Sequence, residues 1–184
     1  MARMLYATLV GLVGAALVHL AIVLMLPQLS ANDVWRQVES KTELNKPFRL
    51  DRASNGVEIA AARSLDSLFA VVACRYDLTE GVFSITAPGS GDFWSIAVFD
   101  DFGRILFSAN DRIVASGDLD LAVALPLQMR SLQQTPRAEY ADAILTEAER
   151  NEGFAVIRVF RPDGTWEPVV EDFIDNVECG ANPL

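Results

Sequence analysis

The segment Ser67–Leu78, SLFAVVACRYDL, decides the fold of this chain, because one set of alternate positions along it is entirely apolar. Every second position is apolar: Leu68, Ala70, Val72, Cys74, Tyr76 and Leu78. Arg75 and Asp77 fall on the opposite face. A period of two predicts a β-strand that turns Cys74 toward a core.

The following residues repeat this pattern at short intervals. VFSITA (82–87) places Phe83, Ile85 and Ala87 on one face, and PGSG (88–91) turns the chain. FWSIAVF (93–99) is apolar on both faces and predicts a central strand. DDFG (100–103) predicts a tight hairpin leading into RILFSAN (104–110).

Three further segments extend the series. LDLAVAL (119–125) alternates again, ADAILTE (141–147) is an ambiguous short strand, and GFAVIRVF (153–160) is apolar and rich in β-branched residues. Short strands at intervals of 8–12 residues predict a mainly β protein, an antiparallel β-sandwich.

Near the end of the chain, the apolar residues recur with a different period. In TWEPVVEDFIDNV (165–177) the apolar residues follow helical spacing. Thr165 is a suitable N-cap, Pro168 is tolerated in a first turn, and Gly180 is a suitable stop. We predict a C-terminal amphipathic helix on the sheet, with Cys179 at its end reaching Cys74.

The opposite end carries a long apolar run, Met4–Leu26. Its length, about 34 Å as a helix, matches a bilayer core of about 30 Å and predicts one N-terminal transmembrane helix. A cleaved signal peptide, with a site at Leu29-Ser30-Ala31, is the alternative; its apolar core would be shorter. Arg3 before the run predicts that the amino end lies in the cytoplasm, because basic residues near the start of a span stay inside. Arg36, Lys41 and Lys46 after the run weaken that prediction.

These patterns predict three parts. Residues 1–29 form the anchor, 30–64 a juxtamembrane helix (Ala31–Ser40) and linker, and 65–184 the β-sandwich domain. Trp35 is expected at the membrane surface, where Trp is common. The expected location is a bacterial inner membrane, crossed once, with the bulk of the chain periplasmic.

The net charge and the cysteine content narrow the range of possible functions. Residues 31–184 carry 14 basic and 25 acidic residues, a net charge of −11. Such acidity argues against binding to nucleic acid or to anionic lipid head groups. The two cysteines, Cys74 and Cys179, predict one disulfide in an oxidising compartment; two buried free thiols are the alternative.

The stretch Leu65–Arg112 resembles an uncharacterised bacterial family, the domain of unknown function numbered twelve fifty-four. The motifs CRYDLTEG, VFSITAP, FWSIAVFDDFG and FSANDR carry the resemblance in order, and LDLAVALP and GFAVIRVFRPDG extend it. It implies an immunoglobulin-like β-sandwich. In larger members a jelly-roll domain follows, so this chain resembles a short, membrane-anchored form that works with a separately made sister domain. The family brings no catalytic residues.

The chemistry available is that of carboxylates. His19 in the apolar run is the one histidine, which excludes Ser-His and Cys-His pairs in the exported part, and no catalytic, metal or cofactor site is expected. The candidate polar residues are Asp100, Asp101, Asn110, Asp111, Arg112 and Arg158. A β-hairpin would hold Asp100 about 20 Å from Asn110, too far to share an ion.

Arg158 interrupts an apolar strand and must pair with an acid, reach solvent or bind an anion. Asn110-Asp111-Arg112 is typical of a side-chain-supported turn. Trp94 and Trp166 are expected in the core rather than in a ligand groove.

The best-supported hypothesis is an exported interaction or assembly module that binds a protein partner of the cell envelope. The alternatives are a carboxylate-based hydrolase and a module that binds sugars or other small molecules. The hydrolase would need two converging acids, one with a raised pKa.

Overall fold

A computed structural model gives the structure of the chain, and it describes residues 1–51, 66–89, 93–113 and 117–183. The predicted linker and the predicted domain start at Leu65 lie partly on residues 52–65, outside the described ranges. The helices are α1 (Ala2–Lys41), α2 (Pro126–Gln134) and α3 (Glu167–Asp175). Short 3₁₀ turns lie at Asp111–Ile113, Ala138–Tyr140 and Gly164–Trp166.

The strands are β1 (Pro47–Arg49), β2 (Phe69–Asp77), β3 (Val82–Ala87), β4 (Trp94–Asp100), β5 (Ile105–Asn110), β6 (Leu119–Ala124), β7 (Ile144–Glu147), β8 (Glu152–Phe160) and β9 (Glu178–Asn182). They form a five-stranded sheet in the order β1-β2-β8-β4-β5 and a four-stranded sheet in the order β7-β6-β3-β9. The protein is mainly β, as the alternating patterns predict. The pairing is antiparallel except between β6 and β7, which are parallel.

One shared hydrophobic core joins the two sheets. It includes Val72 and Cys74 of β2, Ile85 of β3 and Trp94 of β4, all buried. The predicted disulfide is present: Cys74 on β2 is bonded to Cys179 on β9, with Cα atoms 6.4 Å apart. Because β2 and β9 belong to different sheets, the disulfide links the two layers.

The inward face predicted for β2 is confirmed: Ala70, Val72, Cys74 and Tyr76 are buried, as is Leu78 just after the strand. Leu68 is the exception: it lies before the strand and is 43% exposed. The prediction for the chain end is also incorrect in part. The chain does not end in a helix, because β9 follows α3 and Gly180 lies within that strand, paired with Ser84.

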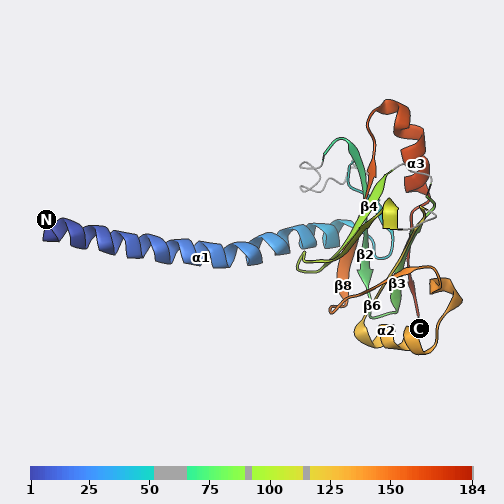
Figure 1. Cartoon of the computed structure of the whole chain (residues 1–184), viewed down its shortest axis with the longest axis horizontal. Coiled ribbons are helices and arrows are strands. Elements are labelled where there is room, and N and C mark those ends of the chain that lie inside the picture. Colours follow the sequence, from blue (N-terminus) through green and yellow to red (C-terminus); the bar gives the residue numbers. More distant parts are fainter. Residues whose placement is uncertain (52–65, 90–92, 114–116, 184) are drawn as a thin grey trace.

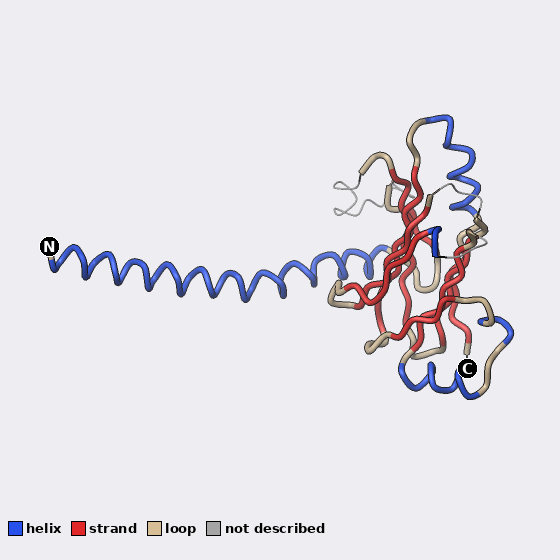
Figure 2. The backbone as a smooth tube through the Cα atoms, viewed as in Figure 1, coloured by secondary structure: helices blue, strands red, loops and turns tan. Residues whose placement is uncertain are grey.

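The separate juxtamembrane helix is incorrect as well. Figure 1 shows α1 as one continuous helix that leaves the domain, and Figure 2 shows the strands gathered at its end. Residues Ala2–Leu26 of α1 are long and apolar enough to cross a membrane, and none of their most apolar window is buried in the protein. The exposed apolar segment therefore belongs to the same continuous helix whose other end meets the β-domain.

Candidate functional site

The last turns of α1 lie on the outer face of the five-stranded sheet. Trp35 and Val38 are buried there against Phe154, with Phe99 and Val156 beside them. The Trp35 ring stacks on Phe154 at 6.1 Å, and Phe99 stacks on Phe154 at 4.9 Å. We call Phe99, Phe154 and Val156 the helix-docking surface. Trp35 thus contacts the domain rather than the membrane surface, which corrects the sequence prediction.

Polar contacts fix the carboxyl end of α1 to β2. Arg75 Nη1 donates to the carbonyl of Glu39 at 2.8 Å, and the Asn45 amide donates to the carbonyl of Arg75 at 2.9 Å. Both the amide and the hydroxyl of Thr42 donate to the carbonyl of Val38. These bonds use orphan carbonyls of the last helical turn. The helix end is therefore bonded to the sheet as well as packed on it.

The strand register shows which way α1 crosses the sheet. Arg75, Phe154, Phe99 and Ile105 are cross-strand neighbours on β2, β8, β4 and β5. The Glu39 carbonyl at the end of α1 accepts a hydrogen bond from Arg75, and Trp35 stacks on Phe154, on which Phe99 stacks in turn. Followed toward its amino end, α1 therefore passes from β2 to β8, in the direction of β4 and β5 in the sheet order. The apolar segment lies farther along α1 in that direction.

The sequence-predicted residues Asp100 and Asp101 lie at the β4–β5 hairpin tip. Asp100 is buried; its Oδ1 accepts from the amides of Phe102 and Arg104, each at 2.9 Å, and its Oδ2 accepts from Arg104 Nε at 2.7 Å. Gly103 has φ 75°, a conformation that suits glycine in this tight turn. The Asp100 carboxylate therefore closes the turn.

Asp101 makes a different contact at the same tip. It forms a bidentate ion pair with Arg150 from the β7–β8 loop, whose guanidinium lies 4.5 Å from the Phe102 ring centroid. The hydroxyl of Tyr76 on β2 donates to the carbonyl of Phe99, next to Asp100, at 2.9 Å. Burial, together with the charges of Asp100 and Asp101, raises the pKa of Tyr76, so its hydroxyl remains a donor at neutral pH.

We expect D100A to lower the free energy of unfolding by about 2 kcal/mol, because two backbone amides and a guanidinium lose their acceptor. D100N should cost less, since its amide oxygen can keep the two backbone bonds while its NH₂ group faces Arg104. Urea unfolding of the chain in detergent measures both. Equal losses in the two variants would contradict this account of the turn.

The remaining candidate residues do not join this tip. Asn110 lies at the other end of β5, about 17 Å away at roughly 3.4 Å per residue, and its Oδ1 accepts from the Arg112 amide at 3.2 Å. Asp111 begins the next turn, and its Oδ1 is buried without a hydrogen-bond partner among the described residues. Arg158 is exposed on the outer face of β8, between Val71 and Ser95, so its side chain reaches solvent.

The two tryptophans expected in the core are both in contact with it. Trp94 is fully buried, and its Nε1 donates to the carbonyl of Gly117 at 2.7 Å. Trp166 is partly buried against the same core. Neither ring is free to form the floor of an open sugar-binding groove, which counts against the sugar-binding alternative.

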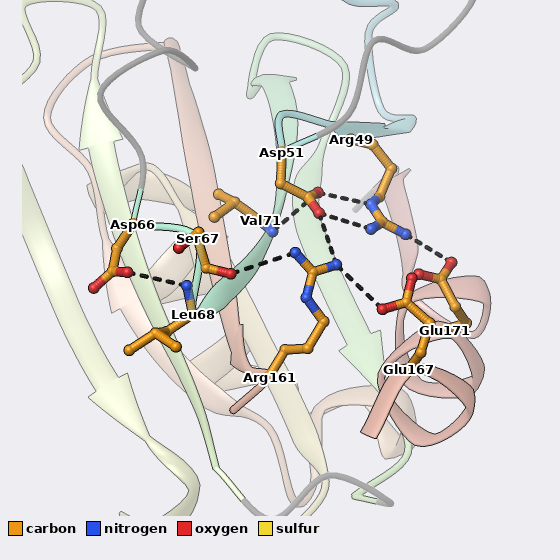
Figure 3. Close-up of polar contacts among 9 residues, drawn as sticks. All are labelled: Arg49, Asp51, Asp66, Ser67, Leu68, Val71, Arg161, Glu167 and Glu171. Carbon is orange, nitrogen blue, oxygen red and sulfur yellow. Dashed lines mark hydrogen bonds and ion pairs between the residues drawn. The ribbon is translucent and has the colours of Figure 1, made fainter. Parts of the chain in front are cut away.

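A second polar cluster, which we call the Asp51 cluster, joins β1, β8 and α3 (Figure 3). Its members are Arg49, Asp51, Arg161, Glu167 and Glu171. Arg49 binds both oxygens of Asp51 and also Glu171, each at 2.9 Å. Arg161 lies 3.6 Å from Asp51 and 3.5 Å from Glu167. The cluster therefore ties the segment before residue 52 to the helix near the chain end.

Sequence reasoning missed the Asp51 cluster. The Glu167–Glu171 spacing of four residues, on the polar face of a helix, was the available signal. Burial raises the pKa of Asp51, but the Arg49 hydrogen bonds and charge, together with the Val71 amide, outweigh burial and lower it overall. A carboxyl with a lowered pKa surrounded by arginines stabilises the fold and is a poor general acid.

We expect D51N to lower the free energy of unfolding by about 2 kcal/mol at pH 7, because the two arginines lose a charged acceptor. A lowered pKa contributes stability above the ordinary value of 3.8 and loses it as the pH falls through the lower folded value. The difference between wild type and D51N should therefore shrink below that pH. The matched control is D172N, an exposed acid next to Glu171; a loss as large in D172N would contradict the role of the cluster.

The carboxyl of Asp120 differs from that of Asp51 in the direction of its pKa shift. Burial, and then the charge of Asp142, raise the pKa of Asp120 on β6. Among the described residues whose carboxyl pKa departs from its ordinary value, Asp120 alone is raised. The described residues include no group of three His, Cys, Asp or Glu side chains placed to hold a metal ion.

Comparisons with known proteins bear on the fold alone. No family model matches the chain, and no curated protein matches it. Its structure is similar to that of the VPA0106 protein from Vibrio parahaemolyticus, with a TM-score of 0.58 and 12% identity over 84% of this chain and 38% of that chain. An uncharacterized protein from Burkholderia cenocepacia gives a TM-score of 0.42 and 14% identity over 73% of this chain and 37% of that chain. The chain thus spans well under half the length of either protein.

Proposed function

We propose that this chain is a membrane-anchored, exported module that holds a β-domain rigidly at the surface of a bacterial inner membrane, where it assembles with a partner protein of the cell envelope. The observation that carries the proposal is the continuity of α1. The same helix contains the exposed apolar segment Ala2–Leu26 and the buried docking residues Trp35 and Val38. A helix that is both anchor and packing element fixes the position of the domain above the membrane.

Three features support export to the periplasm. The inter-sheet disulfide fits an oxidising compartment. The net charge of −11 over residues 31–184 suits a soluble domain held away from an acidic lipid surface. Arg3 precedes the apolar segment, and a basic residue there favours an internal amino end.

We further propose that the fold is immunoglobulin-like and that the chain belongs with the family of unknown function numbered twelve fifty-four. The disulfide between layers and the buried Trp94 support the first proposal, since immunoglobulin domains share both features. The ordered motifs from CRYDLTEG to FSANDR support the second.

The partner we propose is a sister domain carried by another chain. The VPA0106 protein, a solved chain of similar fold, contains further sequence outside the matched 38%. The binding edge we propose is β9, which pairs with β3 alone among the described strands. The disulfide fixes β9 opposite β2, in the sheet that faces the one on which the end of α1 packs. An edge strand offers unpaired main-chain groups to another chain.

A photo-crosslinking amino acid at two matched positions tests this proposal in intact cells. Glu178 and Glu147 are both exposed and lie at the ends of the two edge strands of the four-stranded sheet. We expect Glu178 on β9 to give one dominant cross-linked protein and Glu147 on β7 to give none. Equal yields at both positions, or none at either, would count against assembly through β9.

The second candidate function, a carboxylate-based hydrolase, rests on Asp120. Burial and the charge of Asp142 raise the pKa of Asp120, and a raised carboxyl pKa is one of the features of a general acid. If Asp120 is catalytic, D120N should abolish a measurable hydrolytic activity while D118N keeps it. If Asp120 is only a partly buried surface acid, both variants should behave alike.

A further inference from the structure

The β4–β5 hairpin tip carries an unusual surface for so acidic a domain. Phe102 is 47% exposed and Ile105 is 64% exposed. The guanidiniums of Arg104 and Arg150 lie over the Phe102 ring, at 5.9 Å and 4.5 Å from its centroid. The charges of these two arginines balance those of Asp100 and Asp101, which pair with them. The tip is thus apolar and rich in guanidinium, and the charges of its two ion pairs cancel, although Glu149 and Glu152 flank Arg150 and the charge of Glu152 acts on it.

Its position relative to α1 follows from the strand register. Ile105 is the neighbour of Phe99, one strand farther toward the amino end of α1. In Figure 1 a yellow-green hairpin of the domain lies beside the end of α1. The tip is therefore on the side of the domain from which the apolar segment leaves.

The distances place this edge near lipid. Leu26 and Trp35 are nine positions apart, about 13 Å along a helix. Trp35 stacks on Phe154, and Ile105 lies two strand spacings, about 10 Å, from Phe154 toward the β5 edge. Measured along α1, about 3 Å then separates the β5 edge from the end of the apolar segment. A headgroup layer of roughly 5–7 Å on each side of the hydrocarbon core spans that gap.

We infer that the hairpin tip, Phe102, Arg104, Ile105 and Arg150, contacts the headgroup layer of the same membrane that α1 crosses. This inference rests on the proposed function, since it requires α1 to be the anchor. Aromatic rings and long basic side chains with apolar stems are the groups that occupy a membrane interface. Because Arg104 and Arg150 are already paired with Asp100 and Asp101, the contact depends on insertion of Phe102 and Ile105 and does not require anionic lipid.

Fluorescence quenching by brominated lipid tests the contact in the full chain. The chain is reconstituted in phosphatidylcholine vesicles whose acyl chains are brominated close to the headgroup. F102W and I105W report the tip. L127W is the control, because Leu127 is 77% exposed on α2, which packs on the four-stranded sheet. The fluorescence of each variant is compared with that of wild type, whose three native tryptophans give the background.

We expect the fluorescence added by F102W and I105W to be lost in brominated vesicles, while that added by L127W persists. Addition of phosphatidylglycerol should change neither result. A carbonate wash of the same vesicles separates the two possible failures. If the chain stays in the membrane but neither tip tryptophan is quenched, the lipid contact is overturned and the anchor stands. If the chain is washed off, the anchor itself fails, and the contact fails with it.

Discussion

C74A/C179A should lower the free energy of unfolding of the domain by about 4–5 kcal/mol, because the disulfide closes a loop of 105 residues in the unfolded chain. It also links the five-stranded sheet to β9, the edge strand of the other sheet. The double variant is preferable to either single one, since it leaves no free thiol. Urea unfolding in detergent, with and without reductant, measures the loss.

Two further measurements test this prediction. Reductant should destabilise wild type by a similar amount and should leave C74A/C179A unchanged. A loss below about 1 kcal/mol would mean that the link between the sheets adds little to the stability of the domain. The photo-crosslink at Glu178 would also be expected to weaken in the double variant, because β9 would lose its covalent attachment to β2.

W35A should reduce the free energy that holds the end of α1 on the sheet by about 3 kcal/mol, a typical cost for truncating a buried Trp. The change removes the stacking contact with Phe154, and the remaining buried contact from α1 in that cluster is Val38. That loss raises the population of undocked helix about a hundredfold. Hydrogen exchange at residues 35–41 reports the undocking, because a helix end that is released from the sheet frays in water.

The conservative variant W35F is the control for this prediction. A phenyl ring can still stack on Phe154, so W35F should restore most of the protection that W35A loses. The β-domain itself should keep its unfolding midpoint in both variants, because its core lies on the other face of the sheet. A W35A variant with unchanged exchange at residues 35–41 would contradict the docked helix.

Period-two patterns predicted β2, β3 and β6, and apolar runs predicted β4 and β8, because each of these strands buries at least one face in the core. They could not predict β1, whose three residues PFR are too short for a period. They also missed α2, which begins at Pro126 and buries only Met129 and Leu132. Short elements of this kind are fixed by tertiary contacts rather than by their own sequence.

The polar contacts were harder to predict. The turn at Asp100 follows from the local sequence DDFG. The partner of Asp101 does not, because Arg150 lies 49 residues away. Similarly, 122 residues separate Arg49 from Glu171. The apolar character of Trp35 and Val38 was visible, but a sequence pattern does not say whether an apolar side chain meets lipid or a β-sheet.

Hydrogen exchange of the full wild-type chain in phosphatidylcholine nanodiscs, read by mass spectrometry over the peptides of α1, tests the central claim most directly. A membrane anchor that is docked on the domain predicts slow exchange both in residues 2–26 and in residues 35–41. Rapid exchange in residues 35–41 would contradict docking. Rapid exchange in residues 2–26 would contradict the anchor on which the proposed function depends.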